Sequence, residues 1–233
     1  MVQQDYIAEN IKRVRAAIAE AAIGVGRSPG DISLVAASKT HPAASIRQAI
    51  AAGVDAVGEN RVQELMEKNA QGAYNGSPLH FIGHLQSNKV GKIVGVCDLI
   101  ESVGSKPLLE LIGKKALSLG IVQNVLIEVN IGKESQKSGI LPEQAEEILE
   151  FASRTAGINV IGLMAIPPIN EQNAKCCYYY DTMFKLFIDI GEKKYDNVIM
   201  RILSMGMSDS YVEAIRSGSN MVRIGSAIFG TRY

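Results

Sequence analysis

The 233-residue sequence has no excess of charge of either sign. It contains 24 Lys and Arg residues against 24 Asp and Glu residues, so its formal net charge at pH 7 is zero. No long run of one sign occurs either. Domains that bind nucleic acid usually carry a basic excess gathered on one face. We therefore expect no nucleic-acid partner.

Long apolar runs are also missing. No apolar stretch reaches the roughly 18 residues that are needed to cross a bilayer. The N-terminal segment MVQQDYIAENIKRVRAAIAEAA carries acidic residues early, unlike a secretory signal. Its apolar residues Ile7, Ile11, Val14 and Ile18 recur at helical spacing. We expect no membrane segment, and an extra N-terminal helix that packs on the fold.

Cysteine is scarce. The chain has three cysteines, Cys97, Cys176 and Cys177, which is an odd number without the spacing of a metal site. This pattern disfavours both a disulfide framework and a zinc centre, and it is typical of a reducing compartment. We expect a cytoplasmic protein without a bound metal.

Linkers are absent as well. Apolar residues make up 47% of the chain and charged residues 21%, which are ordinary values for a globular protein with a sizeable core. No Pro/Ser-rich stretch, low-complexity segment or break in composition divides the sequence. We therefore expect one domain that spans residues 1–233.

Apolar runs typical of strands alternate with helical segments along most of the chain. The expected strands are 32–38, 55–59, 79–84, 98–103, 122–130, 158–166, 200–205 and 221–226. The expected helices between them are 43–52, 61–72, 88–95, 106–119, 142–155, 174–193 and 208–217. Pro107 and Pro142 fall where helices should begin, and Gly120 and Gly157 follow helical segments as C-terminal stops should.

This alternation predicts the fold class. Strands that alternate with helices form a parallel sheet covered by helices. Eight such units in a chain close to the typical length of about 250 residues favour a closed (β/α)8 TIM barrel. An open, doubly wound sheet is the alternative. That fold usually shows a GxGxxG turn after its first strand, and the segment SKTHPAA here has no such pattern.

The segment LVAASKT, residues 34–40, ends an apolar strand with a lysine. On the local sequence alone two interpretations remain open. Lys39 can carry its ammonium out to water on an apolar stem. It can also be a lysine held in a site, with its amine placed to attack a carbonyl carbon.

The carboxyl ends of the other strands bear on this choice. In a TIM barrel the active site lies at these ends. The residues expected there are Lys39, Glu59, Asn60, Gly83, His84, Ser102, Asn130, Met164, Ser204, Met205, Arg223, Gly225 and Ser226. Polar groups therefore meet on one rim, while the strand bodies stay apolar. This favours the functional interpretation of Lys39.

The last two units predict an anion site. The segments LSMGMSDS (203–210) and VRIGSAIFG (222–230) each combine a strand end, a glycine and a serine. Backbone N–H groups, serine hydroxyls and close approach at glycine suit a phosphate. TIM barrels often bind phosphate between strands 7 and 8.

A lysine and a phosphate site together indicate an aldehyde that carries a phosphate. Two ligand classes fit: pyridoxal 5′-phosphate (PLP), or a phosphosugar in a Schiff-base aldolase. Arg223 favours PLP, because sites for this cofactor provide Asp or Arg next to the pyridine nitrogen. An arginine only donates hydrogen bonds, so the ring nitrogen would stay unprotonated and PLP would be a weaker electron sink. The alternative role for Arg223 is a salt bridge across the barrel.

Several motifs resemble one known family in its own order. They are LVAASKTHP, VGENRVQE, HFIGHLQSNK, VNIGKESQKSGI, GLMAIPP, LSMGMSD and GSNMVRIGSAIFGTR, which span residues 34 to 232. The sequence resembles the pyridoxal phosphate homeostasis protein family (YggS/PROSC), whose fold is the alanine-racemase-like barrel. The resemblance implies that Lys39 holds PLP as an internal aldimine.

The resemblance also implies the remaining cofactor contacts. Phosphate contacts are expected from the 204–208 turn and from the Gly225-Ser226 turn, with Arg223 facing the pyridine nitrogen and Asn60 close to the cofactor. The full set of expected cofactor-binding residues is Lys39, Asn60, Ser204, Met205, Ser208, Arg223, Gly225 and Ser226. Four positions depart from the family pattern: Leu79, Arg61, Ser210 and Ser226 stand where Trp, Tyr, Asp and Thr are common.

The expected function follows from what the site lacks. Alanine racemases of similar fold add a β-rich second domain that supplies a catalytic tyrosine, and no part of this sequence is left to form one. We expect a protein of intracellular PLP homeostasis with little or no catalysis, which buffers, carries or delivers PLP to apo-enzymes. The alternative is a monodomain PLP-dependent amino-acid racemase. We expect a monomer, with a dimer as the alternative. The sequence leaves the roles of His84 and Lys137 open.

Overall fold

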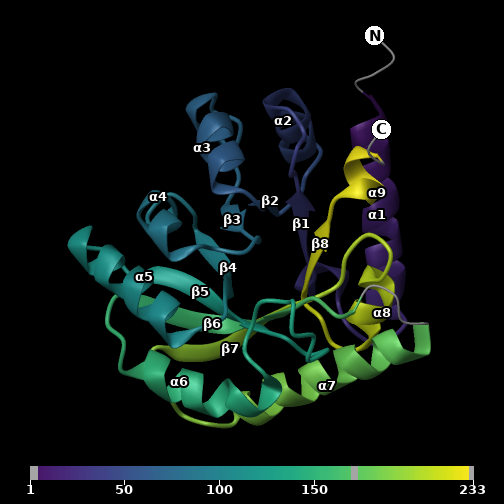
Figure 1. Ribbon diagram of the computed structural model, residues 1–233. Coiled ribbons are helices and arrows are strands. Elements are labelled where there is room, and N and C mark those ends of the chain that lie inside the picture. The colour runs from purple at the N-terminus through teal and green to yellow at the C-terminus, as the bar shows by residue number, and fades with distance from the viewer. Residues whose placement is uncertain (1–4, 169–172, 231–233) are drawn as a thin grey trace.

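Eight parallel strands close into one barrel in the computed structural model, which describes residues 5–168 and 173–230. The strands are β1 (Ser33–Ala37), β2 (Ala56–Glu59), β3 (Leu79–Phe81), β4 (Leu99–Val103), β5 (Gln123–Val129), β6 (Ile158–Ala165), β7 (Val198–Ser204) and β8 (Met221–Ile224). Each strand pairs with its neighbours in the sequence, and β8 returns to β1. The predicted closed barrel is confirmed (Figure 1).

A helix follows every strand. The helices are α1 (Asp5–Ile23), α2 (Ala43–Ala51), α3 (Val62–Ala70), α4 (Val90–Ile93), α5 (Lys106–Ser118), α6 (Ala145–Ser153), α7 (Asn173–Gly191), α8 (Tyr211–Arg216) and α9 (Ser226–Phe229). Short 3-10 helices lead into three elements, at Pro29–Asp31 before β1, Ser87–Lys89 before α4 and Pro142–Gln144 before α6. The predicted alternation is therefore present along the described chain.

The boundary signals at α5 act as predicted. Pro107 lies in the first turn of α5, and the Ser105 hydroxyl at the N-cap accepts the N–H of Leu108 at 3.4 Å. Gly120 follows this helix with φ +69°. Glycine adopts this left-handed conformation without the steric cost that other residues meet. Gly120 therefore ends the helix as its position in the sequence indicated.

Two boundaries at the last strands differ from the prediction. The helix expected from residue 208 begins at Tyr211, because residues 207–210 form a turn in which the N–H of Met207 donates to the Ser210 hydroxyl at 3.3 Å. The strand expected over 221–226 ends at Ile224, since Gly225 is the N-cap of α9. The first correction places Ser208 and Asp209 in a turn, and the second places Gly225 and Ser226 at the start of α9.

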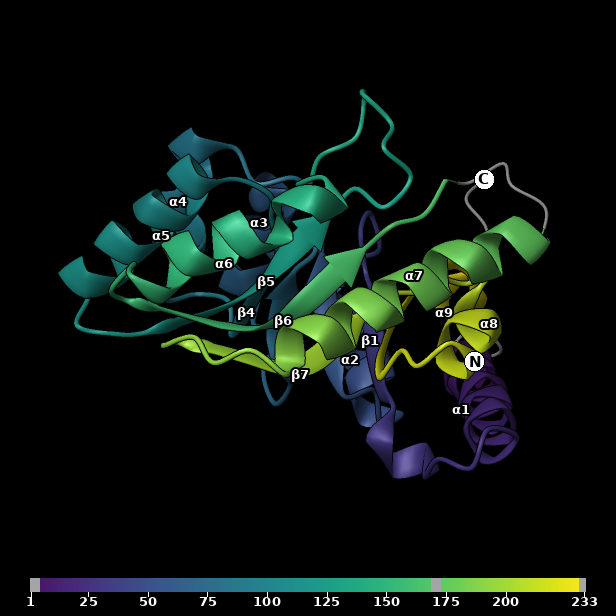
Figure 2. The same ribbon diagram turned by 90° about the horizontal axis from the view of Figure 1, so that it is seen from below.

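The N-terminal helix covers the seam where the barrel closes. Ile7, Ile11, Val14 and Ile18 are at most 4% exposed, so the predicted apolar stripe faces the core. Figures 1 and 2 both show α1 alongside α8 and α9. The Asn10 side-chain amide of α1 donates to the carbonyl oxygen of Ile228 at 3.0 Å. In this way α1 fixes α9, the short helix that begins at Ser226.

The core has an outer layer and a barrel interior. The larger apolar cluster lies between the strands and the surrounding helices. Inside the barrel, two small clusters contain Leu99, Leu126, Ile161 and Met164, and Val35, Ala56 and Met221. Side chains at alternate positions along a strand point to opposite faces. The same inward positions therefore also carry the polar residues described below.

Neither a membrane-spanning helix nor a metal cluster occurs in the described residues. No helix there is long and apolar enough to cross a bilayer, and no three His, Cys, Asp or Glu side chains gather as ligands. Cys97 is buried, and burial raises the pKa of its thiol to about 12. The side chain of Cys176 lies outside the described part of the chain.

Candidate functional site

Lys39 lies in a tight turn directly after β1. The N–H of His41 donates to the carbonyl oxygen of Ser38 at 2.8 Å, which closes the turn. Lys39 has φ +32°, an uncommon conformation for a residue with a Cβ. The Lys39 ammonium makes no hydrogen bond or ion pair with any described residue. Its amine is therefore available to a ligand.

A cavity of about 550 Å³ opens at the carboxyl ends of the strands. Six of the eight predicted cofactor residues line it together: Lys39, Asn60, Ser208, Arg223, Gly225 and Ser226. Sequence reasoning did not assign His41, Ile82 and Ile166 to the site, although all three line the cavity; Met207 and Asp209, which also line it, lie in the predicted anion segment 203–210. Ile82 directly follows β3, and Ile166 directly follows β6, so the rule of strand ends could have found both.

The turns after β7 and β8 are joined by one hydroxyl. Ser208 Oγ accepts the N–H of Gly225 at 3.3 Å and the N–H of Ala227 at 3.2 Å. Within the described residues, the N–H groups of Ser208, Asp209 and Ser226 have no acceptor. Several N–H groups that converge on one cavity wall form a suitable site for an anion.

Two glycines let these turns come close to their neighbours. Gly206 has φ +99°, and a Cβ there would lie 2.7 Å from the Cβ of Ala214. A Cβ on Gly225 would lie 3.2 Å from the carbonyl oxygen of Ala37. The anion turns are therefore packed directly against α8 and the end of β1, which carries the Lys39 turn.

Arg223 lies on β8 and forms part of the cavity floor. Its side chain is 3% exposed, and its guanidinium donates to Ser204 Oγ at 2.5 Å and to the carbonyl oxygen of Ala165 at 3.0 Å. Glu101 Oε2 lies 3.6 Å from the same guanidinium. The salt bridge considered as an alternative for Arg223 is thus present, and the residue lines the cavity as well.

Ser204 and Met205 do not line the cavity. The Ser204 hydroxyl is fully buried, where it accepts from Arg223 and donates to Glu101 Oε2 at 2.6 Å. Met205 is fully buried in the outer core. The chain turns towards the cavity only from Met207 onwards, because β7 ends at Ser204 and Gly206 redirects the backbone.

The acid beneath Arg223 was missed on the sequence. Glu101 is fully buried within β4, and His80 Nδ1 lies 2.7 Å from its Oε1. Burial alone would raise the pKa of Glu101, but His80, Arg223 and Ser204 together outweigh it and leave this pKa lowered. An acid inside the apolar run LIESV was the signal, because a buried carboxylate needs partners.

A second buried acid, Glu128 on β5, makes weaker contacts. It is 8% exposed, and its Oε2 has no hydrogen-bond partner in the described structure. Burial raises the pKa of Glu128, although the charge of Arg223 opposes this shift. Arg223 therefore faces one ionised acid at close range and a second, more readily protonated one.

Asn60 follows β2 at the cavity wall. Its Oδ1 is buried without a hydrogen-bond partner in the described structure, so it is available to accept a hydrogen bond from a ligand. Gly83 allows this placement, because a Cβ on Gly83 would lie 2.1 Å from the carbonyl oxygen of Asn60. An unsatisfied acceptor that lines a cavity is consistent with a ligand site.

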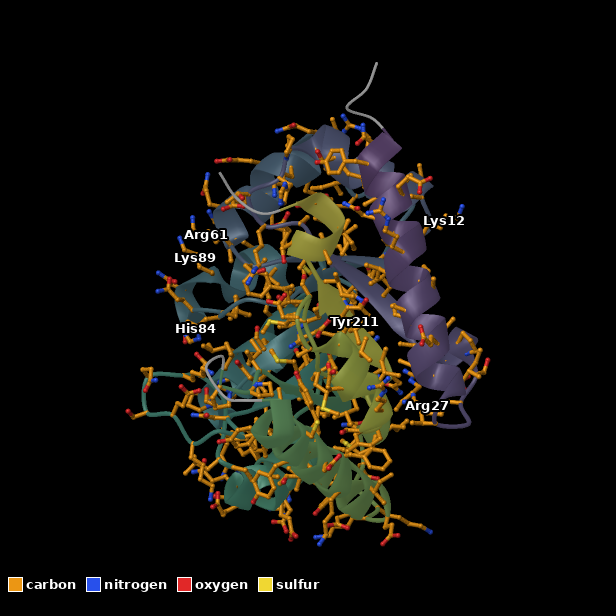
Figure 3. The ribbon with its side chains drawn as sticks, turned by 90° about the vertical axis from the view of Figure 1, so that its right-hand side faces the viewer. Lys12, Arg27, Arg61, His84, Lys89 and Tyr211 are labelled. Atoms are coloured by element: carbon orange, nitrogen blue, oxygen red, sulfur yellow. The ribbon has the colours of Figure 1, made fainter. Side chains whose placement is uncertain are left out.

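His84 and Lys137 both hold the loop after β5. His84 Nδ1 lies 2.8 Å from the Ser138 hydroxyl. The Lys137 ammonium donates to the carbonyl oxygen of Pro167 at 3.2 Å and pairs with Glu134. In Figure 3, His84, Arg61 and Lys89 lie on the opposite side of the molecule from Lys12 and Arg27. Neither His84 nor Lys137 lines the cavity.

Comparison with known proteins defines the class first. The sequence profile of the alanine racemase N-terminal domain matches residues 2–233. The alanine racemase of Clostridium difficile 630 superimposes with a TM-score of 0.73 at 19% identity, over 98% of this chain and 57% of the racemase. At that identity the likeness concerns the fold alone. The class is that of alanine-racemase-like barrels.

Closer relatives identify the family. A protein of Aquifex aeolicus is 39% identical over 96% of this chain and 97% of its own, and one of Escherichia coli K12 is 37% identical over 97% of both. Both are named pyridoxal phosphate homeostasis protein. The chain therefore belongs to the pyridoxal phosphate homeostasis protein family, as the sequence motifs indicated.

Solved structures agree with this assignment. PipY of Synechococcus elongatus, in a structure with PLP bound, has a TM-score of 0.84 and 31% identity over 96% of this chain and all of PipY. The crystal structure of a protein from Bifidobacterium adolescentis has a TM-score of 0.92 and 36% identity, over 97% of this chain and 95% of its own.

Proposed function

We propose that this protein binds PLP as a Schiff base on Lys39 and acts in PLP homeostasis, with little or no catalysis of its own. The observation that carries this proposal is that Lys39 lines the same cavity, of about 550 Å³, as Ser208, Gly225 and Ser226. The relatives named for PLP homeostasis and the PLP-bound PipY structure support the same cofactor.

The residues of the cavity fit this cofactor. The N–H groups of Ser208, Asp209 and Ser226 would hold the phosphate, and Arg223 would face the pyridine nitrogen. Asn60 Oδ1, buried and without a partner, would accept a hydrogen bond from the bound cofactor. PLP would supply an aldehyde, and the Lys39 amine would condense with it to form a C=N bond, with the aldehyde oxygen and the two amine hydrogens lost as water.

The experiment is a borohydride trap. The purified protein, saturated with PLP, should absorb in the visible range and lose this absorbance when borohydride reduces the C=N bond. Peptide mapping should then find the pyridoxyl group on Lys39. A pyridoxyl group on another lysine, or none at all, would overturn the proposal.

The Lys39→Ala variant is the matched control. It lacks the amine but keeps the turns that would hold the phosphate, so it should bind pyridoxine 5′-phosphate and show no imine absorbance with PLP. An aldolase that holds a phosphosugar would also be trapped at Lys39, but the trapped adduct would have the mass of the sugar.

The racemase alternative has less support. Racemisation requires proton-transfer groups on both faces of the substrate, whereas the curated relatives are named for homeostasis and not for a reaction. A panel of L-amino acids, incubated with the PLP-loaded protein and analysed by chiral chromatography, tests this point. Turnover at ordinary enzyme rates of about 1 s⁻¹ or more would restore the alternative.

We also propose the finer features of this role. Residues 1–233 act as one PLP-binding domain and as a cytoplasmic monomer, and PLP passes from Lys39 to recipient apo-enzymes. A single unfolding transition would support one domain, light scattering tests the monomer, and cell fractionation tests the cytoplasmic location. Delivery predicts that the PLP-loaded protein activates a PLP-dependent apo-enzyme faster than the same concentration of free PLP activates it.

A further inference from the structure

A buried ion pair lies directly beneath the Lys39 turn, outside the cavity lining. Glu59, at the end of β2, is fully buried, and the Lys68 side chain on α3 is 10% exposed. Glu59 Oε1 accepts from the Lys68 ammonium at 2.7 Å, from Ser38 Oγ at 2.5 Å and from the Tyr74 hydroxyl at 3.1 Å. One carboxylate oxygen thus accepts three hydrogen bonds.

The two charges hold the Lys39 turn at consecutive residues. The Lys68 ammonium also donates to the backbone carbonyl oxygen of Lys39. Glu59 accepts the hydroxyl of Ser38, the residue before it. The pair therefore fixes the backbone that carries the Lys39 side chain, while the side chain itself stays available to the cavity.

Two features of this arrangement are unfavourable by themselves. Lys39 has φ +32°, a left-handed conformation that is disfavoured for residues with a Cβ. A buried ion pair is also a poor source of stability, because desolvation of the two charges offsets their attraction. Strained backbone persists where the surrounding contacts over-determine it, and such sites are often functional.

We propose that Lys68 is a positioning residue for Lys39. Its ammonium, oriented by Glu59, holds the Lys39 carbonyl and keeps the turn in the conformation that directs the Lys39 amine into the cavity. This inference rests on the proposed function, since it assumes that PLP reacts at Lys39. Lys68 would then control the covalent step at Lys39 without contacting the cofactor.

The structure predicts a split between covalent and non-covalent binding. Lys68 contacts the turn of the amine, whereas the N–H groups of Ser208 and Ser226 belong to the segments after β7 and β8, which Lys68 does not contact. Loss of Lys68 should therefore weaken the Schiff base with PLP. It should leave the affinity for pyridoxine 5′-phosphate, which has no aldehyde, almost unchanged.

The test uses Lys68→Met and the double variant Glu59→Gln/Lys68→Met. The double variant removes both charges of the Glu59–Lys68 pair, while Glu64, which lies 3.6 Å from the Lys68 ammonium, keeps its pair with Arg61. Gln keeps an acceptor for Ser38, so the double variant remains informative if the single variant does not fold. The equilibrium constant for the Schiff base is taken from a PLP titration of the imine absorbance. Pyridoxine 5′-phosphate affinity comes from calorimetry. Lys106→Met is the control, because Lys106 pairs with Glu147 on the exposed surface.

We expect the Schiff-base constant to fall about tenfold or more, with pyridoxine 5′-phosphate affinity within about twofold of wild type. The Lys106→Met control should match wild type in both. Unchanged Schiff-base formation, or an equal loss of both kinds of binding, would overturn the positioning role. Failure of the wild-type protein to form a Schiff base on Lys39 would instead overturn the proposed function, so the two failures are distinguishable.

Discussion

The two walls of the cavity are held in different ways. The wall with Lys39 depends on side chains from other elements, namely Glu59 at the end of β2 and Lys68 on α3. The wall with the N–H groups consists of turns that the Ser208 hydroxyl ties together. The Lys39 turn therefore depends on charged side chains of other elements, whereas the wall with the N–H groups depends on one serine hydroxyl that accepts from backbone N–H groups. The predictions below test this difference, from the largest expected effect to the smallest.

The floor that both walls share should be the most sensitive element. Glu101→Gln removes the charge beside buried Arg223 and His80. Breaking a buried ion pair typically costs about 3–5 kcal/mol of unfolding free energy, which urea denaturation would measure. The control is Glu147→Gln, an exposed partner of Lys106, where we expect a loss of about 1 kcal/mol or less. Equal losses in the two variants would contradict this view of the floor.

The same acid predicts a pH dependence. The pKa of Glu101 is lowered in the folded protein, because His80, Arg223 and Ser204 outweigh the effect of burial. Its stabilising contribution is therefore present above the unfolded pKa, about 4.3, and is lost as the pH falls through the folded value. The difference in unfolding free energy between wild type and Glu101→Gln should stay constant near neutral pH and shrink below pH about 4. A difference that grows as the pH falls would mean that the pKa of Glu101 is not lowered in the folded protein.

Gly83→Ala should disturb the wall with Asn60. The new Cβ would lie 2.1 Å from the carbonyl oxygen of Asn60, and overpacking of this kind typically costs about 1–3 kcal/mol. The expected results are a lower melting temperature and weaker PLP binding. Gly91→Ala on α4 is the matched control, because a Cβ there meets no atom within 4 Å. A harmless Gly83→Ala would show that this wall is less tightly packed than its contacts indicate.

Ser208→Ala should affect only the anion wall. It removes the acceptor that the N–H groups of Gly225 and Ala227 share, and a lost hydrogen bond of this kind costs about 1–2 kcal/mol. PLP affinity should fall about tenfold. Schiff-base formation with pyridoxal, which has no phosphate, should stay at the wild-type level. Ser118→Ala, on the exposed face of α5, is the control. A matching loss with pyridoxal would mean that the two walls are not separable.

The smallest effect concerns the backbone of the amine wall. Lys39→Ala and Lys39→Gly both remove the amine, but only glycine adopts the φ of +32° without strain. We expect the Gly variant to be more stable than the Ala variant by up to about 1 kcal/mol. Thermal unfolding of the two variants measures this difference. A less stable Gly variant would mean that the turn stores no strain.

Much of the barrel was predictable from local signals. The βα alternation gave all eight strands in order, and Gly120 and Pro107 marked helix ends correctly. The largest boundary errors lie at β3, where the strand expected over 79–84 ends at Phe81, and after β7. There the helix expected from residue 208 starts at Tyr211. Ser208 has the residue type of a helix cap, but its hydroxyl instead accepts the N–H of Gly225, which follows β8.

The candidate site was predictable only in part. Lys39, Asn60, Arg223 and the Gly225-Ser226 turn follow from the rule that polar groups gather at strand ends, and all of them line the cavity. Glu101 and the Lys68 contact were missed. Ser204 was expected beside the phosphate, yet its hydroxyl bonds Glu101, 103 residues away in the sequence. No local pattern relates residues at such a distance.

Local patterns along the chain were enough to predict the barrel, the edge at which polar groups gather and the family of the protein. These depend on apolar periodicity, turn residues and motifs that act within a few positions of one another. The folded structure was needed to show which side chains hold the Lys39 turn and which serine supports Arg223. Barrel closure brings distant strands together, and a buried charge takes whichever partner that closure provides.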